Sequence, residues 1–118
     1  MTEITINGEV YVKKDELPIP ATTDSMEYVI VRTYSAGVHA GLLKKRDGKE
    51  VTLINARRLW EWAGAFTLSE IAVNGVSKPN ECKFSCVVPE ILVTEAIEII
   101  PCTKKGKNSI AGVKSYEC

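Results

Sequence analysis

The pattern of hydrophobic and polar positions predicts β-structure over residues 28–62. In EYVIVRTY, side chains alternate between two faces and the residues are mostly β-branched or aromatic, as is typical of a strand. Asp47-Gly48 then predicts a hairpin turn, and EVTLINARRLWEW returns as a second long strand. ARRLWEWAG has the composition of a helix as well, but the two-residue spacing of Trp60 and Trp62 favours a strand face. We therefore expect a β-meander in this half.

The second half alternates helix signals with apolar strand-like runs. Thr67 and Glu70 form a capping box and Asn74-Gly75 supplies a stop, which predicts a short helix over residues 68–74. KFSCVV and EILVTEAIEII read as two strands broken by Pro89. Thr103 is placed to cap a final helix over KKGKNSIAG, which Gly106 weakens. The predicted fold class is α+β, a mostly antiparallel sheet with two short helices.

The N-terminal segment differs from the rest of the chain. Asn7-Gly8 lies between alternating apolar residues and predicts a hairpin, and the polar, proline-containing stretch after it reads as a linker. We therefore divide the chain into a hairpin and linker arm, residues 1–26, and a single α+β domain, residues 27–118.

Composition excludes several classes of protein. Fifteen basic and fifteen acidic residues give no formal net charge, which disfavours a binder of duplex nucleic acid. The N-terminus lacks the pattern of a signal peptide, and the apolar runs are too short to span a bilayer, so we expect no membrane association and a cytosolic protein. The cysteines are then expected to be reduced, with Cys86 and Cys102 buried as small hydrophobic residues. Only Cys82 and Cys86 approach the spacing of zinc ligands, which disfavours a zinc site.

YSAGVHAG, residues 34–41, contains the only histidine of the chain. His39 has no recognisable triad, nucleophile elbow or metal-ligand cluster around it, so we expect no catalytic residue, no metal and no cofactor. The small residues predict either a bulge or bend, or a backbone that a ligand or second subunit approaches closely. The second interpretation concerns Ala36, Gly37, Ala40 and Gly41.

Three arginines lie within segments that are predicted to form strands, where a charged side chain needs a structural or functional explanation. They are Arg32, Arg57 and Arg58. Because side chains alternate along a strand, Arg57 and Arg58 face opposite ways and cannot serve one site within a subunit. Such an arginine stacks on tryptophan or pairs with a glutamate, or it offers its planar fork to a phosphate. The sequence leaves both interpretations open.

YVIVRTYSAGVHAG, NARRLWEWAGAFTLSEIA, NECKF and TEAIEII together resemble a family of small proteins from tailed phages and prophages, described mostly as a domain of unknown function. The resemblance covers residues 28–114. It implies a phage protein made in the cytoplasm of a bacterial host.

The same pattern is similar to the Thoeris anti-defence one family, phage proteins that sequester cyclic ADP-ribose isomers and, in some members, cyclic oligonucleotides without degrading them. The resemblance implies a homo-oligomer, dimer or hexamer, that binds a small nucleotide signalling molecule. It implies phosphate contacts from Arg32 and from Arg57 or Arg58, base stacking on Phe84, and a ligand or subunit contact at residues 36–41.

Two other functions stay open at this point. One is a protein-interaction module that masks a host factor, with the aromatic residues of RLWEW as its anchor. The other is a hydrolase that uses His39. The absence of a recognisable catalytic set favours a binding protein over the hydrolase.

Overall fold

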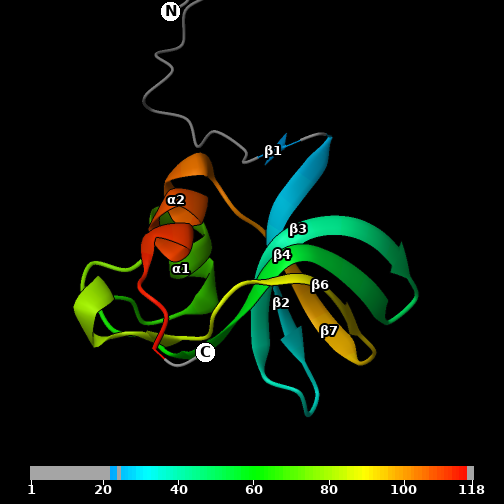
Figure 1. Cartoon of the computed structure of the whole chain (residues 1–118), viewed down its shortest axis with the longest axis horizontal. Helices are drawn as coiled ribbons and strands as arrows, with labels where there is room; N and C mark the ends of the chain where they lie inside the picture. Colours follow the sequence, from blue (N-terminus) through cyan, green and yellow to red (C-terminus); the bar gives the residue numbers. More distant parts are fainter. Residues whose placement is uncertain (1–21, 24, 117–118) are drawn as a thin grey trace, which may run out of the picture.

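The structure is a computed structural model, and it describes residues 22–23 and 25–116 (Figure 1). The hairpin predicted around Asn7-Gly8 and most of the linker lie outside the described residues. The described part is mostly antiparallel β-sheet with two helices, which confirms the predicted α+β class.

One strongly curved sheet dominates the molecule, and the two helices pack against one side of it (Figure 1). Five strands follow one another across the sheet in the order β7-β2-β3-β4-β6, and the short strands β1 and β5 add to β2 and β4. The strands are β1 (Thr22–Thr23), β2 (Met26–Thr33), β3 (Val38–Asp47), β4 (Glu50–Glu61), β5 (Lys83–Phe84), β6 (Val88–Val93) and β7 (Ala96–Pro101). The helices are α1 (Leu68–Asn74) and α2 (Lys104–Gly112), and a 3-10 turn spans Pro79–Glu81.

The alternation of side chains along the strands produces two cores on opposite faces of the sheet. The first lies under the helices and includes Ile30, Phe84 and Ile110, all fully buried. The second lies inside the curve of the sheet and includes Val31 and Leu53. Both faces of β2 are therefore buried, which explains why EYVIVRTY is apolar on both sides at its start.

The β-meander predicted over residues 28–62 is confirmed. β3 and β4 form a hairpin in which Asp47 pairs with Glu50 and Gly48 adopts a positive φ of 62°. β4 continues to Glu61, so ARRLWE is a strand and not a helix. A register shift between Leu59 and Glu61 then turns Trp62 toward the core under the helices, whereas Trp60 points outward. The two tryptophans therefore do not share a face.

The predicted strand break at Pro89 is wrong. Pro89 lies inside β6, which pairs only with β4 among the described strands. A proline lacks the N–H donor, and an edge strand accommodates it because its outer side needs no partner. The breaks lie instead at residues 85–87 and 94–95.

Both predicted helices form, with the predicted caps. Thr67 Oγ1 accepts a hydrogen bond from the Glu70 amide, and Gly75 ends α1 with a φ of 79°. Thr103 Oγ1 caps α2 by accepting from the Gly106 amide. Gly106 is buried against the Ala72 carbonyl of α1, where a Cβ atom would collide. The glycine that weakens the helix in isolation thus allows the two helices to pack closely.

The cysteines differ in state. Cys82 and Cys102 are buried free thiols, and burial raises the pKa of Cys102 to about 12. Cys86 is half-buried and takes part in a disulfide, so the expectation of a buried, reduced thiol is wrong at this position. Within residues 22–23 and 25–116, no three histidine, cysteine or carboxylate side chains are placed to hold a metal ion. Neither described helix has the length and apolar character that crossing a membrane requires.

Candidate functional site

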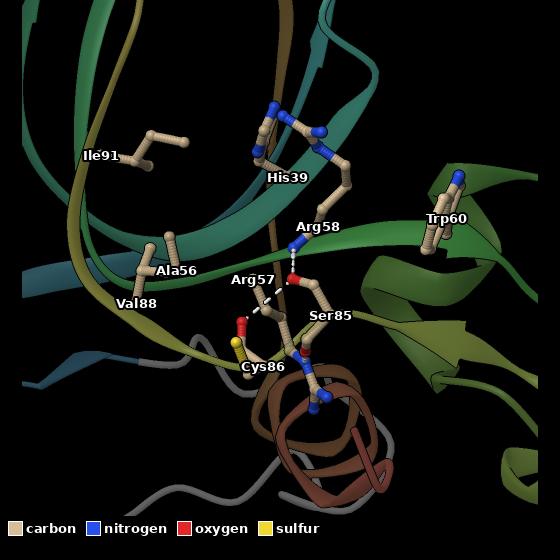
Figure 2. Close-up of a pocket in the computed structure, with 9 residues that line it drawn as sticks. All are labelled: His39, Ala56, Arg57, Arg58, Trp60, Ser85, Cys86, Val88 and Ile91. Carbon is tan, nitrogen blue, oxygen red and sulfur yellow. Dashed lines mark hydrogen bonds between the residues drawn. The ribbon is translucent and has the colours of Figure 1, made fainter. Parts of the chain in front are cut away.

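A cavity of about 280 Å³ opens between the middle of β4 and the segment that leads into β6 (Figure 2). Its apolar floor consists of Ala56, Val88 and Ile91. Polar atoms come from His39 and Arg58 on one side and Ser85 on the other, and Trp60 stands at the far end. Arg57 and Cys86 complete the lining.

Strand register explains why these residues meet. On β4, alternation places Ala56, Arg58 and Trp60 on the face that bears the cavity. On β3, His39 lies directly opposite Arg58, so the two side chains project from neighbouring positions of that face. Val88 at the start of β6 pairs with Ala56 and closes the floor.

The ring of His39 is held in one orientation by the β2–β3 turn. Nε2 lies 3.0 Å from the carbonyl oxygen of Ala36, and only 2% of the residue is exposed. Burial lowers the pKa of His39 below 6.5, the hydrogen bond to Ala36 opposes that shift, and the positive charge of Arg58 adds to it. The imidazole is therefore neutral at pH 7.

Arg58 offers an uncommitted guanidinium group. Its backbone amide donates to Ser85 Oγ at 2.8 Å, but its side chain makes no hydrogen bond or ion pair with any other described residue. Its aliphatic part passes beside Gly37 in the β2–β3 turn. The guanidinium lies next to the His39 ring in Figure 2. Among the arginines predicted to bind phosphate, Arg58 is the one that lines the cavity with a free charge.

Arg57 has a different position, because its side chain passes under the helices. Nε donates to the Ser85 carbonyl at 2.9 Å, and Nη1 donates to the Ile110 and Val113 carbonyls at 3.0 and 2.8 Å. The guanidinium also lies 5.4 Å from the centre of the Phe84 ring, and it points away from the cavity toward α2 in Figure 2. Burial lowers the pKa of Arg57, although the neighbouring Tyr28 raises it. These contacts fasten the end of α2 to the sheet and leave no fork for a phosphate.

Arg32 and Phe84 also lie apart from the cavity. Arg32 is exposed at the end of β2, and its Nε donates to Glu98 Oε1 of β7 at 3.1 Å, which is the structural pairing considered for a strand arginine. Phe84 is fully buried beneath α2. A ring without exposed surface cannot stack on a base, so the structure does not support the role that the resemblance implies for Phe84.

Only part of the YSAGVHAG backbone is accessible. Ala36 and Gly37 are exposed in the β2–β3 turn, whereas Ala40 and Gly41 are buried in the middle of the sheet and pair with β2. A register shift places Gly41 opposite the two residues Asn55 and Ala56 of β4, which is the bulge interpretation. A Cβ atom on Gly41 would lie 3.0 Å from Ala56 Cα. The close approach at Gly41 is therefore made by β4.

Sequence reasoning missed several cavity residues. The sequence suggests His39 as a catalyst, a metal ligand or a turn residue, and Trp60 as an anchor for a partner protein or a surface on which an arginine stacks, but not as parts of one cavity. Ser85, Val88 and Ile91 carried no signal, because they reach the cavity through the pairing of β6 with β4 and not through their spacing along the chain. The pairing of β3 with β4, predicted from Asp47-Gly48, was the one available hint that His39 and Arg58 are neighbours.

Comparison with known sequences identifies one family. A family model described as a domain of unknown function, DUF6948, matches residues 26–110. No curated protein and no solved structure matches the chain. The match begins at β2 and ends within α2, so it includes all the strands and helices that build the cavity. The chain belongs to the DUF6948 family.

Proposed function

We propose that this protein is a binding protein that captures a small phosphate-bearing nucleotide in the cavity between β4 and β6, without degrading it. The observation that carries the proposal is that one cavity with an apolar floor is lined both by the free guanidinium of Arg58 and by the exposed residue Trp60. Arginine binds phosphate through paired N–H donors, and an exposed indole offers a surface on which any base stacks.

The size of the cavity limits what one subunit can enclose. About 280 Å³ is at the lower end of the range for small-molecule sites, so one base or one sugar-phosphate unit fits, and a larger nucleotide extends beyond the mouth. A second subunit is the simplest cover for the remainder. We therefore include a homo-oligomer, dimer or hexamer, in the proposal.

Sequestration is proposed over turnover for a chemical reason. Hydrolysis needs a general acid or base with a positioned partner. The single histidine is tied to the Ala36 carbonyl, and the charged group next to it is an arginine. That arrangement suits holding a ligand better than transferring a proton.

In its finer form, the proposal follows the resemblance to phage anti-defence proteins. The ligand is then a nucleotide immune signal of the bacterial host, a cyclic ADP-ribose isomer or a cyclic oligonucleotide, and the protein acts in the host cytoplasm. The support for this form comes from the sequence blocks that carry the resemblance and from a cavity whose chemistry suits a nucleotide.

Isothermal titration calorimetry with cyclic ADP-ribose isomers and cyclic di- and trinucleotides tests the proposal. Arg58→Ala is expected to raise Kd by about tenfold or more, since a charge-assisted contact contributes about 1.5–3 kcal/mol. Arg46→Ala removes the same charge near the far end of β3, outside the cavity, and is the matched control, expected to leave Kd unchanged. Absence of heat with every ligand, or equal Kd values for the two variants, would overturn the proposal.

The proposed stacking of a base on Trp60 is tested separately, with its own control variant. Trp60→Ala is expected to raise Kd by about 5- to 150-fold, the equivalent of 1–3 kcal/mol for one base on an aromatic ring. Phe66→Ala removes a more exposed aromatic ring that lies outside the cavity, 96% exposed against 62% for Trp60, and is expected to have no effect.

The second candidate function is a protein-interaction module, and one observation favours it. Trp60 packs edge-to-face against Tyr116 with ring centroids 6.2 Å apart, and both residues remain more than half exposed. Exposed aromatic pairs of this kind are common anchors of protein interfaces. A pull-down from host lysate that recovers one stoichiometric protein, lost with Trp60→Ala, would support this function over nucleotide binding.

A further inference from the structure

His39 presents an unused hydrogen-bond acceptor beside Arg58. A carbonyl oxygen only accepts, so the contact between Nε2 and the Ala36 oxygen requires the proton to be on Nε2. In the neutral ring, Nδ1 then carries a lone pair. No described residue donates a hydrogen bond to Nδ1. The ring lies on the wall of the cavity, so a ligand that binds there can supply the donor.

The position of His39 relative to Arg58 indicates which chemical groups a ligand needs in order to contact both residues. The two residues are directly opposite each other on β3 and β4, so their side chains are neighbours on one face. Arg58 has only donors and favours an anion, whereas neutral His39 offers an acceptor at this wall. A ligand that satisfies both has a phosphate and, next to it, an O–H or N–H group.

We propose that His39 is the residue that selects ribonucleotides over 2′-deoxyribonucleotides, with Nδ1 accepting a hydrogen bond from the ribose hydroxyl adjacent to the phosphate that Arg58 binds. This inference rests on the proposed function. In a ribonucleoside 3′-phosphate, and at each 3′–5′ linkage of a ribo-oligonucleotide, the 2′-hydroxyl is the neighbour of the phosphate, and deoxyribose lacks it.

Two features make this acceptor selective. The Ala36 contact keeps the ring from turning, so the lone pair has a fixed direction. Only a small part of His39 is exposed, and a ligand bound in the cavity covers it, so an acceptor that finds no donor in the complex loses free energy. A deoxyribose therefore leaves Nδ1 unpaired, whereas a ribose satisfies it.

The preference for ribose over deoxyribose is also expected to depend on pH, because His39 gains a proton as the pH falls. Arg58 of β4 is the charged group next to the ring, β2 contributes the apolar Val31 opposite it, and the turn contributes the Ala36 carbonyl. Glu95 lies in the neighbouring turn, where its carboxylate accepts from Ser35 Oγ at 2.6 Å. When His39 gains a proton, Nδ1 becomes a donor, so it no longer accepts from a hydroxyl and instead attracts the phosphate.

The test compares adenosine 3′-monophosphate with 2′-deoxyadenosine 3′-monophosphate by calorimetry at pH 7.5, using the full chain. We expect the ribonucleotide to bind about 5- to 10-fold more tightly, as one neutral hydrogen bond allows. The ratio is expected to fall to about one in His39→Phe, which keeps a ring but has no acceptor, and to recover in part in His39→Asn, which restores an acceptor oxygen. Arg58→Ala weakens both nucleotides by the same factor.

A pH series on the unaltered protein gives a readout that needs no variant to fold. Below the pKa of His39, the ribose preference is expected to disappear while both nucleotides bind more tightly. Equal affinities at pH 7.5, or a preference that persists in His39→Phe, would overturn this inference and leave the proposed function standing. If neither nucleotide binds, and no cyclic nucleotide does, the proposed function fails and this inference fails with it.

Discussion

Arg57 and Arg58 are adjacent on β4, yet their guanidinium groups lie on opposite faces of the sheet and have unlike partners. Arg57 donates to the carbonyls of Ile110 and Val113 at the end of α2, whereas Arg58 stands free beside His39. One strand thus carries an arginine that holds the fold together and an arginine that is available for a ligand. The contrast makes the two residues controls for each other.

Arg57→Met is expected to lower the free energy of unfolding by about 3 kcal/mol. The change removes three hydrogen bonds donated by a charged group, and of the two acceptors at the end of α2 only the Ile110 carbonyl keeps another donor among the described residues, the Val113 amide. Urea denaturation followed by circular dichroism measures the loss as a lower midpoint at constant slope.

Arg58→Met is the matched control for this experiment. It alters the same side chain on an exposed position, and the free energy of unfolding is expected to change by no more than about 0.5 kcal/mol. Similar midpoints for the two variants would contradict the structural role of Arg57.

Gly106→Ala is expected to destabilise the protein by about 2 kcal/mol or more. Alanine is the better helix former by about 1 kcal/mol, but its Cβ atom would collide with the Ala72 carbonyl of α1. Thermal unfolding monitored by circular dichroism should show a lower Tm.

Gly112→Ala tests whether that loss comes from the contact or from the helix itself. Gly112 is also in α2, but nothing lies within 4 Å of the position its Cβ would take. The free energy of unfolding should stay the same or rise slightly. A loss of stability in both variants would mean that α2 needs glycine for some reason other than its packing on α1.

The pKa of His39 is expected to lie below 6.5, and to rise when Arg58 is replaced by alanine. Burial is the larger cause of the lowered value, and the charge of Arg58 adds to it. Since the chain has one histidine, a single imidazole signal reports the titration by NMR. An unchanged pKa in Arg58→Ala would show that the two side chains are farther apart than the structure places them.

Folding stability should depend on pH through the same residue. A histidine with a lowered folded-state pKa makes its contribution above about pH 6.5, and the contribution is lost as the pH falls through the folded-state value. The difference in free energy of unfolding between the unaltered protein and His39→Gln should therefore shrink on acidification. A difference that stays constant between pH 7.5 and pH 5 would contradict a neutral, buried His39.

Cys102 is expected to resist alkylation in the folded protein. Burial raises its pKa to about 12, so the reactive thiolate is scarce at pH 8 and the reagent has little access. Mass spectrometry after iodoacetamide treatment should find Cys102 unmodified until denaturant is added. Rapid modification in native buffer would indicate that the end of β7 opens readily.

Local signals in the sequence account for much of the fold. Asp47-Gly48 marked the β3–β4 turn, and Thr67 and Thr103 marked the helix caps, because each motif satisfies its hydrogen bonds within a few residues. The strand break predicted at Pro89 was wrong, because a proline disrupts a central strand but is accommodated in an edge strand. Whether a strand lies at an edge depends on partners elsewhere in the chain.

The candidate site was harder to predict for the same reason. Alternation along β4 correctly separated Arg57 from Arg58, but it did not say which of them faced the helices. That choice depends on where α2 packs, and α2 begins more than forty residues later in the chain. The register shift beyond Leu59, which divides Trp60 from Trp62, likewise has no signature in the residue pattern.

The partnership of β2 with β7 has a consequence for the order of folding. β2 is the first long strand of the described chain, and its edge is completed by β7, as in the pair Arg32 and Glu98, which are 66 residues apart. Contacts so distant in sequence slow folding, because a long loop must close before they form. During synthesis, β2, β3 and β4 can associate as soon as they leave the ribosome, but the apolar edge of β2 waits for almost the whole chain. The late arrival of β7 is thus the expected rate-limiting event, and a chain interrupted before residue 96 would expose an edge prone to aggregation.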